Sequence, residues 1–204
     1  MINCTYAALS KILRRIDKNL LTGVWLDFFS GNGYAAMQAC WPYKIDLLHI
    51  DRGPEKNILI PHGRLAGYLL TNRGNDEASR TALALAQQYI KSNFIVQDIC
   101  HLAADPQVIT ERLCGVQVQG ALLLNPPWDP LPLEAAFQLA KSFLIPGSPL
   151  VIITDSPSVD MYNEAQVDFF RQKISENWLG LREFPDIGYL MHALVAYQSA
   201  DSGY

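Results

Sequence analysis

The sequence lacks the features that mark several large classes of protein. Only 18% of its 204 residues are charged and 50% are apolar, which excludes an intrinsically disordered chain. No stretch approaches the roughly 18 consecutive apolar residues that a membrane-spanning helix requires. The N-terminal segment has no apolar core of a secretory signal. We therefore expect one cytoplasmic domain over residues 1–204, with no membrane as a partner.

Metal ligands and some nucleotide motifs are also missing. The four cysteines (Cys4, Cys40, Cys100 and Cys114) form no C-x-x-C pair, and no two histidines have metal-ligand spacing, so we expect reduced thiols and no metal site. There is no phosphate-binding G-x-x-x-x-G-K-[ST] loop and no Tyr-x-x-x-Lys pair of small dehydrogenases. A formal net charge of −4 makes the chain a weak independent binder of duplex phosphates.

What the chain does contain is an alternation of short apolar runs with helical patterns. This alternation predicts an α/β doubly wound fold whose parallel sheet is covered by helices. Helices are expected over about 6–20, over 75–91, around Ala136–Phe143 and around Val167–Trp178. Strands are expected over 23–29, 44–50, 93–96, 120–124 and 149–154, followed by a closing hairpin of 179–184 with 190–198. Within this plan, residues 1–22 form an N-terminal helical segment and residues 52–74 an irregular insertion, interpreted as a lid or part of a substrate cleft.

Polar residues follow the predicted strands, where ligands bind in such sheets. The first of these loops is Asp27-Phe28-Phe29-Ser30-Gly31-Asn32-Gly33. Its glycines allow a tight turn and a close approach of the backbone to a ligand. Asp51 follows Gly31 by 20 residues, the spacing at which an acid can accept hydrogen bonds from ribose hydroxyls. The loop also fits G-x-G-x-x-A, so alone it does not separate a nicotinamide dinucleotide from another adenosine-containing cofactor.

The second loop is Asn125-Pro126-Pro127-Trp128. An exocyclic amine or an amide is a poor nucleophile because its lone pair is delocalised. The Asn125 side-chain oxygen and the Pro126 carbonyl are two acceptors that can hold both N–H bonds and turn that lone pair toward a donor. Trp128 offers a flat face for a planar target, worth ~1–3 kcal/mol for a stacked base. The competing interpretation is a buried strand ended by prolines, with Trp128 in the core.

Together the two loops resemble those of the S-adenosylmethionine (SAM)-dependent amino-methyltransferases. That family couples a D-x-F-x-G-x-G loop after the first strand to [N/D/S]-P-P-[Y/F/W] after the fourth, and both are matched in that order. The resemblance implies a Rossmann-like class I methyltransferase sheet, mostly parallel with a closing antiparallel hairpin and helices on both faces. It also implies SAM as the cofactor, with Asp51 at the ribose, Asp98 at the adenine amino group and Ile99 packed beside it. The cofactor residues so implied are Asp27, Phe29, Ser30, Gly31, Asn32, Gly33, Asp51, Asp98 and Ile99; the catalytic residues are Asn125, Pro126, Pro127 and Trp128.

The predicted function is therefore N-methylation of an exocyclic amino group, foremost N6 of adenine in DNA or RNA. No segment is large enough for a separate target-recognition domain, which favours single-stranded or flipped-out bases, or a partner subunit for recognition. A first alternative is methylation of a protein glutamine amide, as in release-factor methyltransferases with N-P-P-Y. A second is a catalytically silent methyltransferase-like subunit that binds nucleic acid. A nicotinamide oxidoreductase has only the glycine pattern in its favour.

Overall fold

The fold is built on a seven-stranded sheet in the order β5-β2-β1-β6-β7-β9-β8. The computed structural model describes residues 4–53, 59–62, 65–69, 92–157, 161–185, 187–188 and 190–199. The strands of the sheet are β1 (Thr22–Phe28), β2 (Lys44–Asp51), β5 (Phe94–Val96), β6 (Val118–Leu124), β7 (Pro149–Asp155), β8 (Trp178–Phe184) and β9 (Met191–Gln198). The pairs among β5, β2, β1, β6 and β7 are parallel, whereas β9 runs antiparallel to both β7 and β8.

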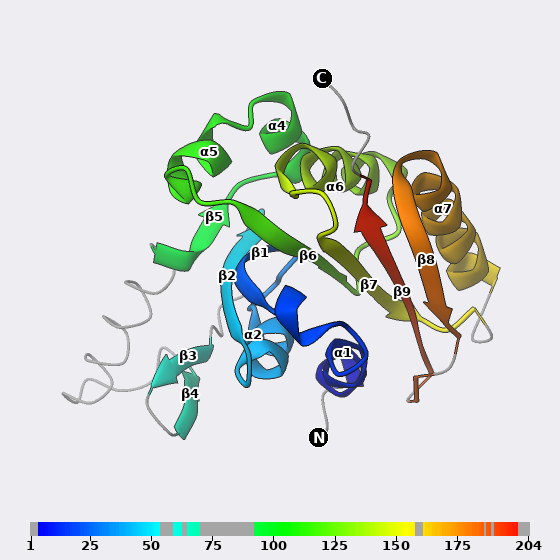
Figure 1. Cartoon of the computed structure of the whole chain (residues 1–204), viewed down its shortest axis with the longest axis horizontal. Helices are drawn as coiled ribbons and strands as arrows, with labels where there is room; N and C mark the ends of the chain where they lie inside the picture. Colours follow the sequence, from blue (N-terminus) through cyan, green and yellow to red (C-terminus); the bar gives the residue numbers. More distant parts are fainter. Residues whose placement is uncertain are drawn as a thin grey trace.

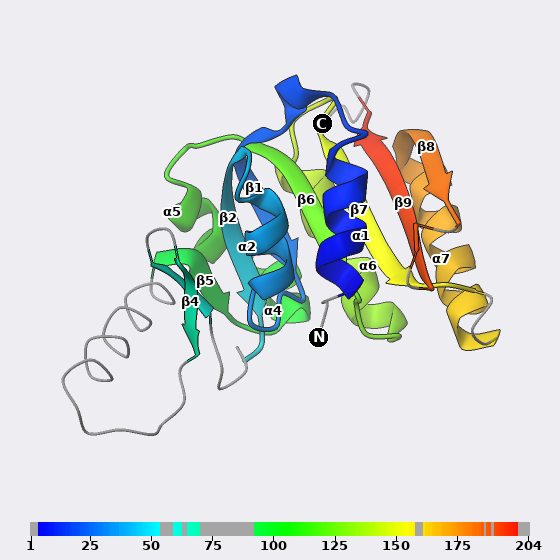
Figure 2. The same ribbon diagram turned by 90° about the horizontal axis from the view of Figure 1, so that it is seen from below.

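Helices cover both faces of this sheet (Figures 1 and 2). They are α1 (Cys4–Leu13), α2 (Tyr34–Cys40), α4 (Ile99–Ala104), α5 (Gln107–Leu113), α6 (Pro130–Phe143) and α7 (Met161–Asn177), with a 3₁₀ turn at Lys18–Leu20. One hydrophobic core lies between the sheet and α4–α7. The other lies between the sheet and the pair α1 and α2. Each central strand is therefore buried on both sides, which explains its nearly continuous apolar sequence.

Strand β1 has neighbours on both sides, β2 and β6. The chain leaves β1 toward β2 on one side and returns to β6 on the other. This reversal of direction opens a crevice beyond the carboxyl ends of the two strands, as in other doubly wound sheets. The loops after β1 and β6 thus meet at one edge of the sheet.

These features confirm the predicted mostly parallel sheet, its closing antiparallel hairpin and its helices on both faces. The observed strands include all those that the sequence predicts, with ends that differ by at most two residues. None of the helices in the described part of the chain combines the length and hydropathy that a membrane crossing requires.

Three local predictions are wrong. The first helix ends at Leu13 rather than near Leu20: the Arg15 N–H donates to the Ile12 carbonyl in a tighter turn, and the Asp17 carboxylate then caps a separate 3₁₀ turn by accepting from the Asn19 N–H. Trp178 is buried but opens β8 instead of ending the last helix. The insertion is not wholly irregular, because β3 (Leu59–His62) and β4 (Leu65–Leu69) form an antiparallel pair within it.

Two further expectations lie wholly or partly outside the described residues. The predicted helix over 75–91 is one of them. The predicted lid over 52–74 is described only in part. Helices α4 and α5, in contrast, are present without having been predicted.

Candidate functional site

A cavity of about 510 Å³ lies at the carboxyl ends of β1, β2, β5 and β6. This volume is in the range of small-molecule and cofactor sites. The lining residues are Phe29, Gly31, Ile50, Asp51, Arg52, Gly53, Gln97, Asp98, Ile99, Asn125, Pro127, Asp129 and Pro132. The cavity thus brings together the glycine loop after β1 and the Asn-Pro-Pro-Trp loop after β6, which are almost one hundred residues apart in the sequence.

The glycine loop turns through three residues with left-handed backbone conformations: Phe29 (φ 57°), Gly31 (φ 55°) and Gly33 (φ 70°). Glycine adopts this conformation without steric cost, whereas a bulky residue such as Phe29 does so under strain. Strain of this kind persists where the surrounding structure enforces it, often at functional sites. The turn is closed by hydrogen bonds from the Ser30 N–H to the Ile50 carbonyl (3.3 Å) and from the Gly33 N–H to the Ser30 carbonyl (2.8 Å).

Asp51, at the end of β2, ties two backbone segments together. One of its carboxylate oxygens accepts a hydrogen bond from the Gly31 N–H at 2.9 Å, and the other accepts from the Gly53 N–H at 3.0 Å. The 20-residue spacing that predicted a ribose-binding acid therefore places this carboxylate directly against the glycine loop. Each carboxylate oxygen keeps a further lone pair for a ligand hydroxyl.

Asp27 lies beneath the loop rather than on the cavity wall. It is buried, and its Oδ2 lies 2.7 Å from Nδ1 of the equally buried His49. Burial raises the pKa of the Asp27 carboxyl, while the hydrogen bond with His49 acts in the opposite direction. Asp27 Oδ1 and Ser30 Oγ are buried atoms without a hydrogen-bond partner among the described residues. Neither residue is among those that line the cavity.

Two other predicted residues, Asp98 and Ile99, follow the carboxyl end of β5. Asp98 caps α4, its Oδ1 accepting from the Cys100 N–H at 2.9 Å, and Ile99 packs beside it with only 6% of its surface exposed. Both line the cavity. An acid and an apolar side chain here form a surface that suits a flat heterocycle carrying an amino group.

In the second loop, Asn125 has a left-handed backbone (φ 47°), which asparagine adopts more readily than most residues. Its N–H donates to the Ile153 carbonyl at 2.8 Å, which ties the loop to the end of β7. Its side-chain Nδ2 donates to Thr5 Oγ1 on α1 at 2.9 Å. The backbone and the side chain of Asn125 are thus both fixed.

The Pro126 carbonyl has a partner that the sequence does not predict, because Nε2 of Gln166 on α7 donates to it at 3.0 Å. Trp128 is 42% exposed and meets Phe169 edge to face, with ring centroids 5.9 Å apart. The alternative in which Trp128 belongs to the core is therefore wrong. The indole is held at one edge and remains accessible to a planar partner.

The predicted residues divide into two groups around the cavity. Lining it are Phe29, Gly31, Asp51, Asp98, Ile99, Asn125 and Pro127. The other six do not line it: Asp27, Ser30, Asn32, Gly33, Pro126 and Trp128. Asn32 serves the turn itself, since its Oδ1 accepts from the Tyr34 N–H at 3.1 Å at the start of α2.

Sequence reasoning missed several lining residues. Asp129 is the cap of α6, its Oδ1 accepting from the Leu131 N–H at 3.2 Å. An acid followed by Pro130 at the start of an apolar helical pattern is a recognisable signal of such a cap. Arg52, Gln97 and Pro132 also line the cavity, and no motif distinguishes them. Among the described residues, no three His, Cys, Asp or Glu side chains gather as metal ligands.

Comparisons with known proteins identify the fold. No protein-family model matches the chain, and no curated protein matches by sequence. The structure is similar to the PH0226 protein from Pyrococcus horikoshii OT3 (TM-score 0.57, 14% identity, covering 94% of this chain and 88% of that one). It is also similar to an rRNA methylase from Streptococcus thermophilus (TM-score 0.50, 14% identity, 98% and 99% covered).

A third similar structure is an O-methyltransferase family protein from Burkholderia thailandensis (TM-score 0.55, 12% identity). That match covers 95% of this chain, which spans only 56% of the length of the Burkholderia protein. At such identities the likeness concerns the fold. The chain has the Rossmann-like α/β fold of class I methyltransferases.

Proposed function

We propose that this protein is an N-methyltransferase that uses SAM to methylate an exocyclic amino group, foremost N6 of adenine in DNA or RNA. The observation that carries the proposal is the convergence of two loops on one cavity. Phe29, Gly31 and Asp51 line one part of it, and Asn125 and Pro127 line another. A donor site and an acceptor site are thereby adjacent, as transfer of a group between two bound molecules requires.

The charge of the cavity favours SAM over a dinucleotide. Three aspartates (Asp51, Asp98 and Asp129) and one arginine (Arg52) line its described part. SAM carries a sulfonium and an ammonium against one carboxylate, so its net charge complements this negative lining. The pyrophosphate of a nicotinamide dinucleotide would be repelled by it.

The residues around the glycine loop also fit SAM. Asp51 and Asp98 would hold the ribose and the adenine amino group, with Ile99 packed against the ring. Asp27 Oδ1 and Ser30 Oγ are buried and do not line the cavity, so these two residues would support the glycine loop rather than contact the cofactor.

Asn125 would hold the group to be methylated. Its side-chain oxygen accepts one N–H of the target, which turns the nitrogen lone pair out of conjugation. When bound, SAM supplies the methyl group: the target nitrogen forms the new N–C bond, the electron pair of the broken C–S bond stays on sulfur, and the methylated nitrogen gives a proton to water. Asn125 is not a base, so this side chain contributes position and hydrogen bonding rather than proton transfer.

Trp128 would supply the platform for the target. Its indole is exposed, and its edge-to-face contact with Phe169 keeps the ring in place. Stacking on an aromatic face contributes ~1–3 kcal/mol per base and tolerates any base. Sequence selection would then depend on a partner subunit or on the structure of the nucleic acid.

A protein glutamine amide is the second candidate target. The observation in its favour is the same negative lining, which does not attract a phosphate backbone to the cavity mouth. A primary amide carries the same NH₂ group and fits the same Asn125 acceptor.

Methyl transfer from radiolabelled SAM to single-stranded DNA, RNA and a protein lysate tests the proposal and separates its targets. Label in DNA or RNA, found as N6-methyladenine after digestion, is the expected result. Label in protein as methylglutamine would favour the second candidate. A methyl group on oxygen, or no transfer to any of the three, would contradict the proposal.

Variants of Asn125 test its assigned role. Asn125→Ala removes the acceptor and should lower kcat by about 100-fold or more, comparable to the loss of one oriented hydrogen-bonding group in other active sites, without abolishing SAM binding. Asn125→Asp keeps an acceptor oxygen at the same place and should retain far more activity than Asn125→Ala. Equal kcat in Asn125→Ala and the unchanged protein would contradict this role.

A further inference from the structure

The acceptor loop is held from one side by the first helix of the chain. Thr5, in the first turn of α1, accepts a hydrogen bond from Nδ2 of Asn125 through its Oγ1 at 2.9 Å, across 120 positions of sequence. Figure 2 shows the N-terminal end of α1 on the side of the sheet where the arrowheads of β2 and β7 lie. Helix α1 therefore reaches the edge at which the cavity opens.

This contact has a consequence for the Asn125 amide. The nitrogen and the oxygen of an amide point in different directions, and an amide that donates to a fixed acceptor has its oxygen fixed as well. With Nδ2 held by Thr5, the carbonyl oxygen Oδ1 is the end left to meet a target in the cavity that Asn125 lines. The contact thus presents an acceptor rather than a donor to the target.

The same loop is held from the opposite side by helix α7. Gln166 is buried, with 5% of its surface exposed, and its Nε2 donates to the Pro126 carbonyl at 3.0 Å. Its other amide atom, Oε1, accepts from Oγ1 of the buried Thr154 on β7 at 2.6 Å. Because both ends of this amide are paired, the Gln166 side chain has one orientation. A carbonyl oxygen has two lone pairs, and Gln166 engages one of those on Pro126, so the direction of the other lone pair is fixed as well.

We propose that Thr5 and Gln166 are positioning residues, which hold the Asn125 oxygen and the Pro126 carbonyl as a pair of acceptors for one NH₂ group. The inference rests on the proposed function. It adds a reason for selectivity: an NH₂ group has two hydrogens for two acceptors, whereas a hydroxyl has one and can donate to only one of them. Sites that hydrogen-bond a substrate group discriminate strongly against analogues lacking it.

Kinetics of matched variants test the first contact. Thr5→Val removes the hydroxyl and keeps the shape of the side chain, and it should lower kcat about tenfold, with the KM for SAM unchanged. Thr5→Ser restores the hydroxyl and should return kcat to within about twofold of the unchanged protein. Thr110→Val, an exposed threonine on α5, is the matched control and should have no effect. A kcat of Thr5→Val within about twofold of the unchanged protein would overturn the role of Thr5.

The second contact needs a variant that leaves as few buried groups unpaired as possible. In Thr154→Val/Gln166→Met the hydroxyl and the amide that bond each other both become apolar, so only the Pro126 carbonyl loses its partner, and the melting temperature will show that the double variant folds. Its kcat should fall about tenfold or more. The ratio of its kcat/KM for an amino target to that for a hydroxyl target should also decrease. A normally folded double variant with unchanged kcat and unchanged preference would overturn the role of Gln166.

A spectroscopic readout separates this inference from the proposed function. In ¹⁵N-labelled protein, the Asn125 side-chain amide protons should exchange faster in Thr5→Val than in Thr5→Ser or Thr110→Val, and their signals should shift. This holds whether or not a methylated product is ever found. Identical Asn125 amide signals in Thr5→Val and the unchanged protein would overturn the inference, whereas an inactive unchanged protein would overturn the proposed function alone.

Discussion

The two glycines of the loop after β1 meet different surroundings although both have left-handed backbones. A Cβ added to Gly31 would have no heavy atom within 4 Å, whereas one added to Gly33 would lie 2.8 Å from Cε1 of the buried His49. Gly31 also lines the cavity, and Gly33 does not. Gly31 therefore has free space on the side where a ligand would bind, whereas Gly33 is packed against the His49 side chain.

Alanine at each position should separate these two roles. Gly33→Ala combines backbone strain with a steric clash and should lower the free energy of unfolding by roughly 2–4 kcal/mol. Gly31→Ala carries the strain alone, roughly 1 kcal/mol, but its methyl group should weaken SAM binding. Urea unfolding and calorimetric titration with SAM measure the two effects. An equal loss of stability in both variants would refute the distinction.

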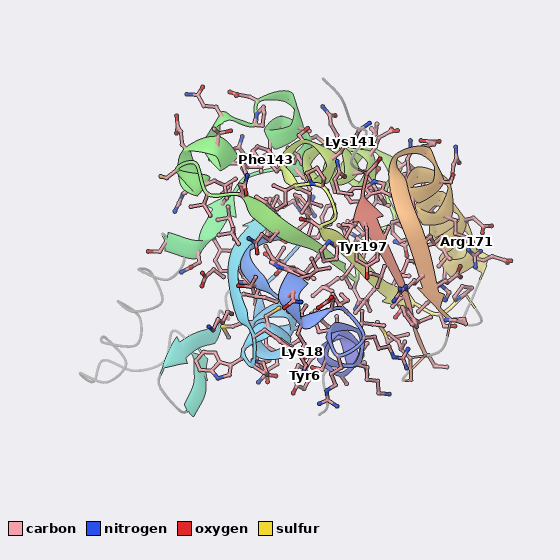
Figure 3. The ribbon with its side chains drawn as sticks, viewed as in Figure 1. Tyr6, Lys18, Lys141, Phe143, Arg171 and Tyr197 are labelled. Atoms are coloured by element: carbon pink, nitrogen blue, oxygen red, sulfur yellow. The ribbon has the colours of Figure 1, made fainter. Side chains whose placement is uncertain are left out.

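His192 gives the protein a dependence on pH away from the cavity. It is 1% exposed, with Nε2 2.9 Å from Oε1 of Glu183, which is also held by Arg171. Figure 3 shows Arg171 on α7 beside β8, at the outer side of the molecule. Burial lowers the pKa of His192 below its ordinary 6.5, and the hydrogen bond from Arg171 lowers the pKa of Glu183 below its ordinary 4.5.

Both shifts predict a loss of stability in acid. Below pH 6.5 the unfolded chain binds a proton at His192 that the folded protein resists, and below pH 4.5 the same holds for Glu183. The melting temperature should therefore fall as the pH drops from about 7 to 4. His192→Gln should flatten the upper part of this fall, while His101→Gln, at an exposed site on α4, should not. Parallel curves for His192→Gln and the unchanged protein would contradict the prediction.

Individual site residues were predictable where chemistry imposes a local pattern. The glycines, Asp51 and Asn125 belong to short motifs with fixed spacing, and the structure gathers Gly31, Asp51 and Asn125 at the cavity. Thr5 and Gln166 were not predictable, because each acts through one hydrogen bond to a loop 40 or 120 positions away. Such a contact depends on how α1 and α7 pack, and a single sequence does not record it.

At the scale of elements, the pairing of β1 with β6 depends on a close approach of the Gly120 backbone on β6 to the Trp25 side chain on β1. A Cβ on Gly120 would lie 2.3 Å from the Trp25 ring, which is fully buried. The register between the two strands also shifts at Val24/Trp25. The missing side chain at Gly120 is therefore what makes room for the indole in the core.

Gly120→Ala should accordingly be among the more damaging single substitutions in the sheet. Overpacking a core typically costs 1–3 kcal/mol, and we expect about 3 kcal/mol here because the clash is with a ring and both strands are central. Urea unfolding measures the loss. Trp25→Leu in the same chain should recover part of it, and Gly53→Ala, where a Cβ would meet nothing within 4 Å, serves as the control. A stable Gly120→Ala protein would show that the strands can separate to admit the methyl group.

The elements themselves were predictable where burial imposes a pattern. Strands β1, β6 and β7 are buried on both faces and are read directly as apolar runs. The end of α1 was not predictable, because Ile16 continues the apolar spacing of the helix and is buried, although the helix has already ended at Leu13. Trp178 similarly continues the spacing of α7 while belonging to β8. Tertiary packing, rather than local preference, decides such boundaries.

At the scale of the whole molecule, ligand binding should stabilise the fold selectively. SAM at about 100 times its dissociation constant should add about 2.7 kcal/mol to the free energy of unfolding. For a chain of this length that is a rise in melting temperature of roughly 5–11 °C. NAD at the same concentration should give no rise, because its pyrophosphate meets the aspartates of the cavity. A thermal shift with NAD and none with SAM would contradict the proposed cofactor.

The position of β9 has a consequence for how the molecule is made. Strand β7 pairs with β6 on one side and with β9 on the other, and β9 is the last strand of the described chain to emerge from the ribosome. Until Met191–Gln198 is synthesised, one edge of this apolar strand is bare and open to pairing with other chains. The nascent protein therefore passes through an interval of exposure to aggregation that closes only when Met191–Gln198 has been synthesised and has paired with β7.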